Sequence, residues 1–397
     1  MSYISHINKY ASSQAIQDAV NNGTLANPYV AINDDTGLLD WNMKVKFDVD
    51  ADDMEFPGSG GTSAITITAS EPWTVTIPSW LTASSLSGNT RQVVTITAQA
   101  TQQANEGTIR ITNGTKTFTV NAEQAEPAID YSTMYFTIEA LESGEFLNQS
   151  NSFSYSVNGG EWTATDWETP IQVQTGDKIR FKSQSDEIMY CGDGIVNFDF
   201  IVYGNIMSLM YGDNFTGQTE NTVSLSNMFA DNAKLISAEH LILPSTTLYG
   251  YEYSTMFTSC YNLTTPPALP ATTLGEYCYQ NMFFGCSGLT TFPALPATTL
   301  AEGCYSGMFN GCYGMETAPV LPALTLEVSC YQGMFYDCGN LMNVTCLATD
   351  ISATDCLSDW LEGASFVGTL HKNPLATSIW LPGTNIPDEW TVQDYSA

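Results

Sequence analysis

The dipeptide Met-Phe occurs five times between Met228 and Phe335, and its last four phenylalanines are spaced 26 residues apart. A Leu-Pro pair recurs at the same interval of 26 residues. Each of the last four copies reads Phe-x-x-Cys-x-x-Leu or Phe-x-x-Cys-x-x-Met, with its cysteine at Cys260, Cys286, Cys312 or Cys338. One such copy cannot bury its apolar residues alone, so neighbouring copies must stack. The repeat therefore predicts a solenoid rather than a globular enzyme.

The copy upstream carries asparagine in the cysteine position and reads Phe229-x-x-Asn232-x-x-Leu235. In leucine-rich repeats one position of each coil holds Asn or Cys, whose small side chain satisfies the turning backbone. In its phase, its Phe-x-x-Cys-x-x-Leu core and its Leu-Pro corner, the segment 221–345 resembles leucine-rich repeats of the BspA-like type. Phe229 lies in the first, atypical coil, where a cap can repack. We therefore expect its truncation to cost less stability than truncation of Phe283.

Two β segments are predicted to flank the repeats. Residues 127–220 alternate apolar and polar side chains, and a turn at Asn158-Gly159-Gly160 between two such runs is a strong hairpin signal. We expect this β unit to cover the first coil. Residues 346–397 leave the 26-residue period. A solenoid needs a cover over its last open coil, so we expect this tail to be the C-terminal cap.

Residues 62–126 also alternate in the manner of strands and predict a compact antiparallel β-sandwich. The order of Pro72-Trp73-x-Val75, Trp80-Leu81, Ser87-Gly88 and Gly107-Thr-Ile109 resembles a BACON domain, a module of Bacteroidetes proteins often associated with carbohydrate. Asn105-Glu106 replaces the basic residue that usually precedes the Gly-x-Ile strand. Trp73 and Trp80 are candidate sugar-stacking aromatics, and packing in the core of the sandwich is the alternative.

The first 61 residues are expected to form a docking element and a linker. Residues 43–61 are acidic and rich in glycine, which is typical of a flexible linker. Residues 1–42 predict a short helix followed by a small hairpin, too little material for an independent core. We expect them to dock on another protein through apolar side chains. These anchor residues are Ile16, Val20, Tyr29, Val30, Ile32 and Trp41.

Charge excludes one class of partner. The chain holds 42 acidic and 11 basic residues, a net charge of −31, whereas nucleic-acid binding needs clustered Lys and Arg. The N-terminus lacks a charged leader followed by an apolar stretch, so we expect no secretory signal, and no run is long enough for a membrane span. The overall fold class predicted is mainly β and multidomain.

Little in the sequence indicates catalysis. His6, His240 and His371 are far apart, and nucleophile, phosphate-loop and zinc-protease motifs are absent. We predict no catalytic residue, no metal site and no cofactor. Seven of the ten cysteines lie in repeat register, which favours ladders of small buried side chains with free thiols. Disulfides along such a ladder remain an alternative.

Four tyrosines recur at one position of the repeat and are the candidate ligand-binding aromatics. Tyrosine offers contact area at low entropic cost, so an exposed column could be a binding stripe. A column packed inside the solenoid is the alternative. The four residues are Tyr253, Tyr279, Tyr305 and Tyr331.

Two functional hypotheses follow. The segment from Ala15 to Ile32 resembles N-terminal segments of structural proteins of crAss-like phages that infect Bacteroidetes. This resemblance implies a non-enzymatic head-fibre or capsid-decoration protein of the virion, assembled in the host cytoplasm. Residues 1–42 would bind the major capsid protein or another virion protein, and the protein would form a homo-oligomer, a trimer if it is a fibre. Its exposed domains would bind a glycan or protein of the host surface. The alternative is a bacterial cell-surface or secreted adhesin, the usual context of BspA-like repeats.

Overall fold

The computed structural model describes residues 31–32, 39–40, 47–101, 103–126, 128–147, 151–183, 187, 189–221, 223–377 and 379–396. The described chain is mainly β and falls into two compact units, residues 1–129 and 130–397. Its helices are short: α3 (Ser208–Tyr211) and the 3-10 turns η1 (Tyr131–Thr133) and η2 (Gly212–Asn214). A mainly β, multidomain chain is what the sequence predicts.

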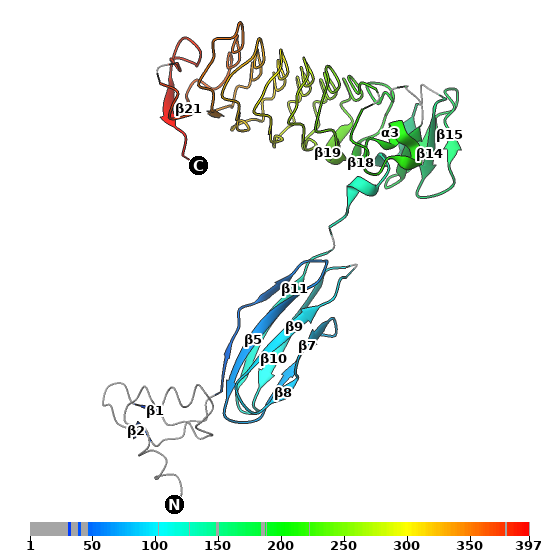
Figure 1. The fold of residues 1–397 in the computed structure, drawn as a ribbon. Coiled ribbons are helices and arrows are strands. Elements are labelled where there is room, and N and C mark those ends of the chain that lie inside the picture. The colour runs from blue at the N-terminus through cyan, green and yellow to red at the C-terminus, as the bar shows by residue number, and fades with distance from the viewer. Residues whose placement is uncertain are drawn as a thin grey trace, which may run out of the picture. The chain divides into compact units, whose positions relative to one another are not determined.

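In the first unit two sheets enclose one apolar core, and Figure 1 labels β5 and β10, one strand from each sheet. Inward side chains alternate along the strands, so Ile65, Ile67, Ile109 and Ile111 are all fully buried. One sheet has the order β3 (Phe47–Asp50), β5 (Gly61–Ala69), β9 (Gln92–Ala98), β7 (Leu81–Ala83). The other has the order β4 (Met54–Phe56), β11 (Thr117–Gln124), β10 (Asn105–Thr112), β6 (Trp73–Thr76), β8 (Ser87–Gly88).

The flexible linker expected at residues 43–61 is wrong for the part of this segment that the structure describes. From residue 47 onward this segment forms β3 and β4, two strands of the sandwich. Phe47, Met54 and Phe56 are buried, whereas Asp48 and Glu55 point to solvent between them. Carboxylates at every second position gave the segment a linker-like composition and hid its strand period. Further upstream, β1 (Ala31–Ile32) pairs antiparallel with β2 (Leu39–Asp40), which agrees with the expected hairpin.

The second unit begins with a six-stranded sheet. Its last strand, β19 (Leu235–Ile242), lies parallel to β18 (Phe200–Asn205) and belongs to the first repeat. A small separate sheet pairs β13 (Gly144–Phe146) with β16 (Ile171–Val173). One continuous apolar cluster includes both this region and the repeats. The sheet order is β15 (Thr163–Ala164), β14 (Phe153–Val157), β17 (Lys178–Ser183), β12 (Thr137–Ala140), β18, β19.

From β19 onward the repeats form a stack of similar coils, the row of loops between β19 and β21 in Figure 1. Alternate N–H groups donate to the next coil: Phe257 to the carbonyl of Met282 and Phe283 to that of Met308, both at 2.9 Å. The N–H groups between them bond within their own coil, as Met256 donates to Tyr253. The phenylalanines stack in line, with ring centroids 5.4 Å apart for Phe257 and Phe283.

Each coil needs left-handed backbone at intervals of four residues. In the coil of Phe283 these positions are Tyr277, Asn281 and Gly285, with φ values of 55°, 52° and 71°. Glycine and asparagine tolerate this conformation, whereas tyrosine pays for it. In the next coil all three positions are glycine, which explains why Gly303, Gly307 and Gly311 recur there.

The tail continues the stack after the 26-residue period ends. Strands β20 (Asn343–Cys346), β21 (Gly368–Lys372) and β22 (Trp390–Asp394) pair in parallel, one strand from each successive coil. Trp360 takes the phenylalanine position, 6.3 Å from the ring of Phe335, and Trp380 follows at 5.8 Å from Trp360. The tail thus adds further coils of other lengths, which the loss of the motif concealed.

Candidate functional site

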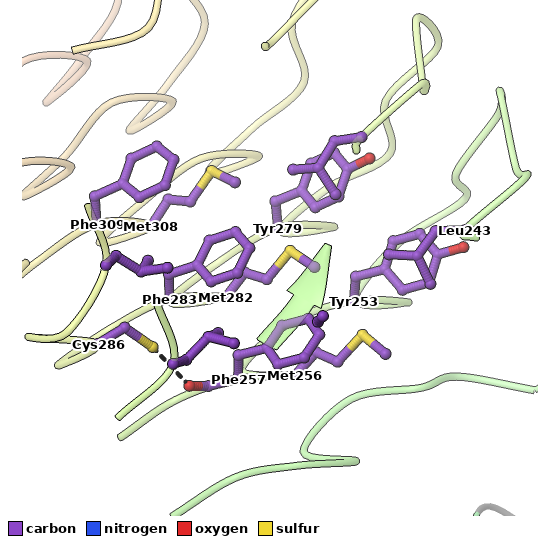
Figure 2. Packing of buried hydrophobic residues seen from close by; sticks show 14 of the residues in the cluster. Leu243, Tyr253, Met256, Phe257, Tyr279, Met282, Phe283, Cys286, Met308 and Phe309 are labelled. Atoms are coloured by element: carbon purple, nitrogen blue, oxygen red, sulfur yellow. Dashed lines mark hydrogen bonds between the residues drawn. The ribbon is translucent and has the colours of Figure 1, made fainter. Parts of the chain in front are cut away.

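The repeated tyrosines line the interior of the coil stack. Tyr253, Tyr279, Tyr305 and Tyr331 are each 1% exposed. Their rings stack at centroid distances of 5.8, 5.7 and 6.1 Å. Figure 2 shows two of them beside the phenylalanine and methionine columns. Such side chains cannot contact a ligand from solvent. They form the packed column that the sequence left open as the alternative to a binding stripe.

The cysteines are also interior. All ten are buried and unpaired. One ladder consists of Cys260, Cys286, Cys312 and Cys338, and each of its thiols donates to a phenylalanine carbonyl of the preceding coil. Figure 2 shows the bond from Cys286 Sγ to Phe257 O, which is 2.9 Å long. Burial raises the pKa of Cys286 to about 12, so the thiol stays protonated at neutral pH. This ladder satisfies backbone carbonyls, and the thiols are not poised for nucleophilic chemistry.

The two candidate tryptophans of the sandwich differ in exposure. Trp73 is 1% exposed and its indole N–H donates to the carbonyl of Thr90 at 3.1 Å. Trp80 is half-buried, donates to Glu106 O at 3.3 Å and lies edge-on to Phe56 at 6.0 Å. Trp73 is thus a core residue. Trp80 keeps part of its ring at the surface.

The anchor residues Ile16, Val20, Tyr29, Val30 and Trp41 lie outside the described residues, and for Ile32 the description extends to the backbone alone.

Several aromatic side chains that reach solvent lie on one side of the coils, whereas Tyr249, which is 74% exposed, lies just before this side in the chain. We define this side, the outer wall, as residues 251–262, 277–288, 303–314 and 329–340. Tyr251, Tyr261 and Tyr313 are 52%, 53% and 54% exposed, and Phe284 is 39% exposed. The other wall positions that are not buried are mostly Ser, Thr, Asn, Gln and Gly. The wall therefore combines aromatic rings with hydroxyl and amide groups.

The outer wall is also almost free of charge. Within the four wall segments the charged residues are Glu252 and Asp337, and Glu276 and Glu302 each precede a segment by one residue, in a protein of net charge −31. Depletion of charge together with enrichment in aromatics distinguishes binding surfaces from ordinary protein surface. Most of the 42 acidic residues of the chain lie outside these four segments.

Two aromatic groups can be distinguished on the wall. Tyr251 and Tyr277 stack with centroids 5.1 Å apart, and the hydroxyl of Tyr277 donates to Glu302 Oε1 at 2.6 Å. Tyr261 and Tyr313 occupy the same repeat position two coils apart, with Ser287 at that position in the coil between them. Coils are separated by roughly 5 Å, so these two tyrosines flank a serine over roughly 10 Å.

The repeated tyrosines Tyr253, Tyr279, Tyr305 and Tyr331, which the sequence offered as ligand-binding candidates, are buried, and other aromatics are exposed. A tyrosine repeated in every coil is a packing residue, because stacked interior positions demand the same side chain each time. The exposed aromatics vary from coil to coil, as Tyr261, Ser287 and Tyr313 do. Variation within an otherwise strict repeat was the available signal for the surface.

Among the described residues, no three His, Cys, Asp or Glu side chains are grouped so that they could hold a metal ion. In the same part of the chain, no helix is long and apolar enough to cross a membrane.

Comparison with known proteins gives little to add. No protein-family model matches the sequence, and no curated protein matches it. One solved structure with partial similarity is a Bacteroides ovatus GH5 xyloglucanase in complex with a XXXG heptasaccharide. The two chains are 25% identical over 23% of this chain and 21% of that one, with a TM-score of 0.20. This chain thus spans about a fifth of the xyloglucanase, and the similarity assigns neither fold nor activity.

Proposed function

We propose that this chain is a non-enzymatic adhesion protein of a phage virion, whose coil stack binds an uncharged glycan of the host surface. The observation that carries the binding role is the outer wall, a neutral aromatic face on a protein of net charge −31. The virion assignment rests on the resemblance of residues 15–32 to N-terminal segments of phage structural proteins.

A neutral sugar suits this wall for three physical reasons. Tyrosine rings pack against the apolar faces of pyranoses while their hydroxyls stay hydrated. Serine, threonine, asparagine and glutamine supply donors and acceptors for sugar hydroxyls. Few charges would have to be desolvated when a ligand covers the wall, because its four segments hold Glu252 and Asp337 as their charged residues. A wall with these properties is built for recognition rather than for bond breaking.

The finer fold assignment is part of the proposal. The repeats fit BspA-like leucine-rich repeats because their 26-residue spacing, Cys or Asn position and Leu-Pro corner coincide with parallel bonding between coils. The first unit fits a BACON domain because it is a two-sheet sandwich with Trp73 buried in its core. In this arrangement residues 1–42 attach to the major capsid protein or another virion protein. A homo-oligomer, trimeric if the protein is a fibre, then presents several walls and gains avidity.

The alternative is a bacterial surface adhesin. BspA-like repeats and an uncharged wall fit that role equally well, since both kinds of protein bind surfaces. The two proposals differ in where the protein resides: on purified particles or on the cells of the bacterium that encodes it.

The deciding experiment is quantitative mass spectrometry of density-purified particles. We expect the full-length chain at a fixed copy number per major capsid protein, and loss of the 43–397 truncation from particles although it remains folded in solution. A full-length chain found in the cell envelope of uninfected bacteria and absent from particles would overturn the virion proposal in favour of the adhesin. Normal incorporation of the truncation would move the attachment site out of residues 1–42.

A further inference from the structure

Two hydroxyl groups inside the coil stack lack a partner. The Oη atoms of Tyr279 and Tyr305 are buried, and no donor or acceptor of the described residues lies within hydrogen-bonding distance of either. Leaving a buried hydroxyl unsatisfied costs free energy, so native structures rarely do so. The repeat nevertheless keeps tyrosine at this position in four successive coils rather than phenylalanine.

The first tyrosine of the column, Tyr253, has the side-chain partner that Tyr279 and Tyr305 lack among the described residues. Tyr253 Oη lies 3.5 Å from Asn221 Oδ1, and Ser245 Oγ donates to the same atom at 3.3 Å. Ser245 is 1% exposed and polar. The equivalent residues of the next three coils, 26, 52 and 78 positions later, are Ala271, Ala297 and Ala323. The repeat therefore replaces the polar neighbour with alanine but retains the hydroxyl.

The spacing of the column fits a bridging atom. The rings of Tyr279 and Tyr305 are parallel within 1°, with centroids 5.7 Å apart, so their hydroxyls are separated by about the same distance. Figure 2 shows the hydroxyls of Tyr253 and Tyr279 pointing to the same side. This separation is too long for a direct hydrogen bond. An oxygen midway would be roughly 2.9 Å from each hydroxyl, close to an ordinary O–H···O distance.

We propose that a buried water binds between Tyr279 and Tyr305 and joins their hydroxyls. A tyrosine hydroxyl can both donate and accept a hydrogen bond. Each hydroxyl can therefore bond to the water and still have a donor or acceptor left for the neighbouring coil. Buried waters need two to four polar partners, and the two hydroxyls meet that minimum. Ala271 and Ala297 offer no side-chain hydrogen bond at the position where Ser245 bonds to Asn221 in the first coil.

The site would extend toward the first coil. Asn221 Nδ2 is another buried donor without a partner among the described residues. The spacing of Tyr253 and Tyr279 is 5.8 Å, nearly the same as that of the next pair. A water between Tyr279 and Tyr305 would fix the register of these two coils through hydroxyls that two phenylalanines could not offer.

The test uses the full-length variants Tyr279→Phe, Tyr305→Phe and the double variant, measured by thermal unfolding. A bridging water predicts that each single variant lowers Tm by ~2–4 °C, the shift expected for loss of one net hydrogen bond in a domain of this size. It also predicts that the double variant falls by less than the sum, because both hydroxyls serve one water. Tyr253→Phe, which loses a protein partner, should lower Tm under either outcome and reports that the assay detects a lost bond.

A rise in Tm for the single variants would overturn the proposal. If the hydroxyls are dry, removing each one relieves an unsatisfied group, so both single variants should raise Tm additively. A crystal structure at high resolution gives an independent readout: density for an oxygen within hydrogen-bonding distance of both Oη atoms is expected, and an empty position between them contradicts the water.

Discussion

The side-chain amide of Asn232 donates to the carbonyl of Cys191 at 2.6 Å. In later coils the same position is a cysteine whose thiol donates to a phenylalanine carbonyl of the coil before it. The first coil has no such predecessor, and the segment around Cys191 takes its place. The exchange of Cys for Asn therefore marks the joint between the β unit and the repeats. The asparagine side chain, which is longer than that of cysteine, reaches a carbonyl of the β unit instead of a carbonyl of a preceding coil.

Replacing Asn232 should test this joint. Asn232→Ala removes the donor to Cys191 and the acceptor of the Lys234 N–H, both in a buried setting. We expect a loss of roughly 1–3 kcal/mol in the free energy of unfolding by urea. Asn232→Cys keeps a small donor, as in the other coils, and should cost less than the alanine variant. Equal stability of Asn232→Ala and the wild type would show that the amide does not hold the joint.

Phe229 is more enclosed than its place in the first coil suggested. It is fully buried, stacks on Phe257 at 5.1 Å and meets the ring of Phe136 in the β unit at 6.2 Å. The sequence could show the repeat but not the side chain that covers its first coil, because Phe136 is about ninety positions upstream. The expectation that truncating Phe229 costs less than truncating an interior phenylalanine is therefore revised.

We now expect Phe229→Ala and Phe283→Ala to be equally damaging. Each removes a fully buried ring with neighbours on both sides, which costs about 3–5 kcal/mol in unfolding free energy. Phe284→Ala is the matched control, because its side chain is adjacent in sequence but exposed at the wall, and it should change stability by at most ~0.5 kcal/mol. A loss below about 1 kcal/mol at Phe283 would refute the stacked core.

The ten cysteines should be free thiols shielded by the fold. We expect a thiol reagent to react slowly with the native protein and to count nearly all ten under denaturing, non-reducing conditions. Recovery of fewer than four would indicate disulfides in place of the hydrogen-bonded ladder of Cys260, Cys286, Cys312 and Cys338.

Stability should fall in alkaline solution. Burial raises the pKa of Cys278, Cys286 and Cys346 from an ordinary 9.0 to about 12 in the folded protein. Between these values the unfolded chain has released protons that the folded chain still binds. Stability is thus fully present below about pH 8.5 and declines as pH rises toward 12.

Between these pKa values each such thiol lowers the free energy of unfolding by about 1.4 kcal/mol per pH unit. Urea unfolding between pH 7 and pH 10 measures the slope. We expect a midpoint that is nearly constant up to pH 8 and drops steeply above pH 9. A midpoint at pH 10 equal to that at pH 7 would mean that the thiols already ionise in the folded state.

The sequence predicted the fold of the repeats better than it predicted which of their side chains are exposed. The spacing of Phe257, Phe283 and Phe309 was sufficient to predict the stack, since a strict period directly encodes a repeated core. The strand around Phe47 was missed because acidic residues at alternate positions resembled a linker. The surface was harder still. Whether Tyr253 or Tyr251 faces solvent depends on the turns of the coil, which a left-handed residue every fourth position sets.

Binding by the outer wall is the central claim, and a glycan array probed with the full-length protein tests it most directly. Tyr261→Ser/Tyr313→Ser is the informative variant, because Ser287 already occupies this column in the coil between, so the coils should tolerate the change. Phe366→Ser is the control, since that side chain is 78% exposed but lies off the wall. We predict that the wild type and the control bind neutral glycans in preference to acidic ones, and that the double variant loses at least tenfold in affinity at unchanged Tm. Unchanged binding by the double variant, or no preference for neutral glycans, would contradict the account.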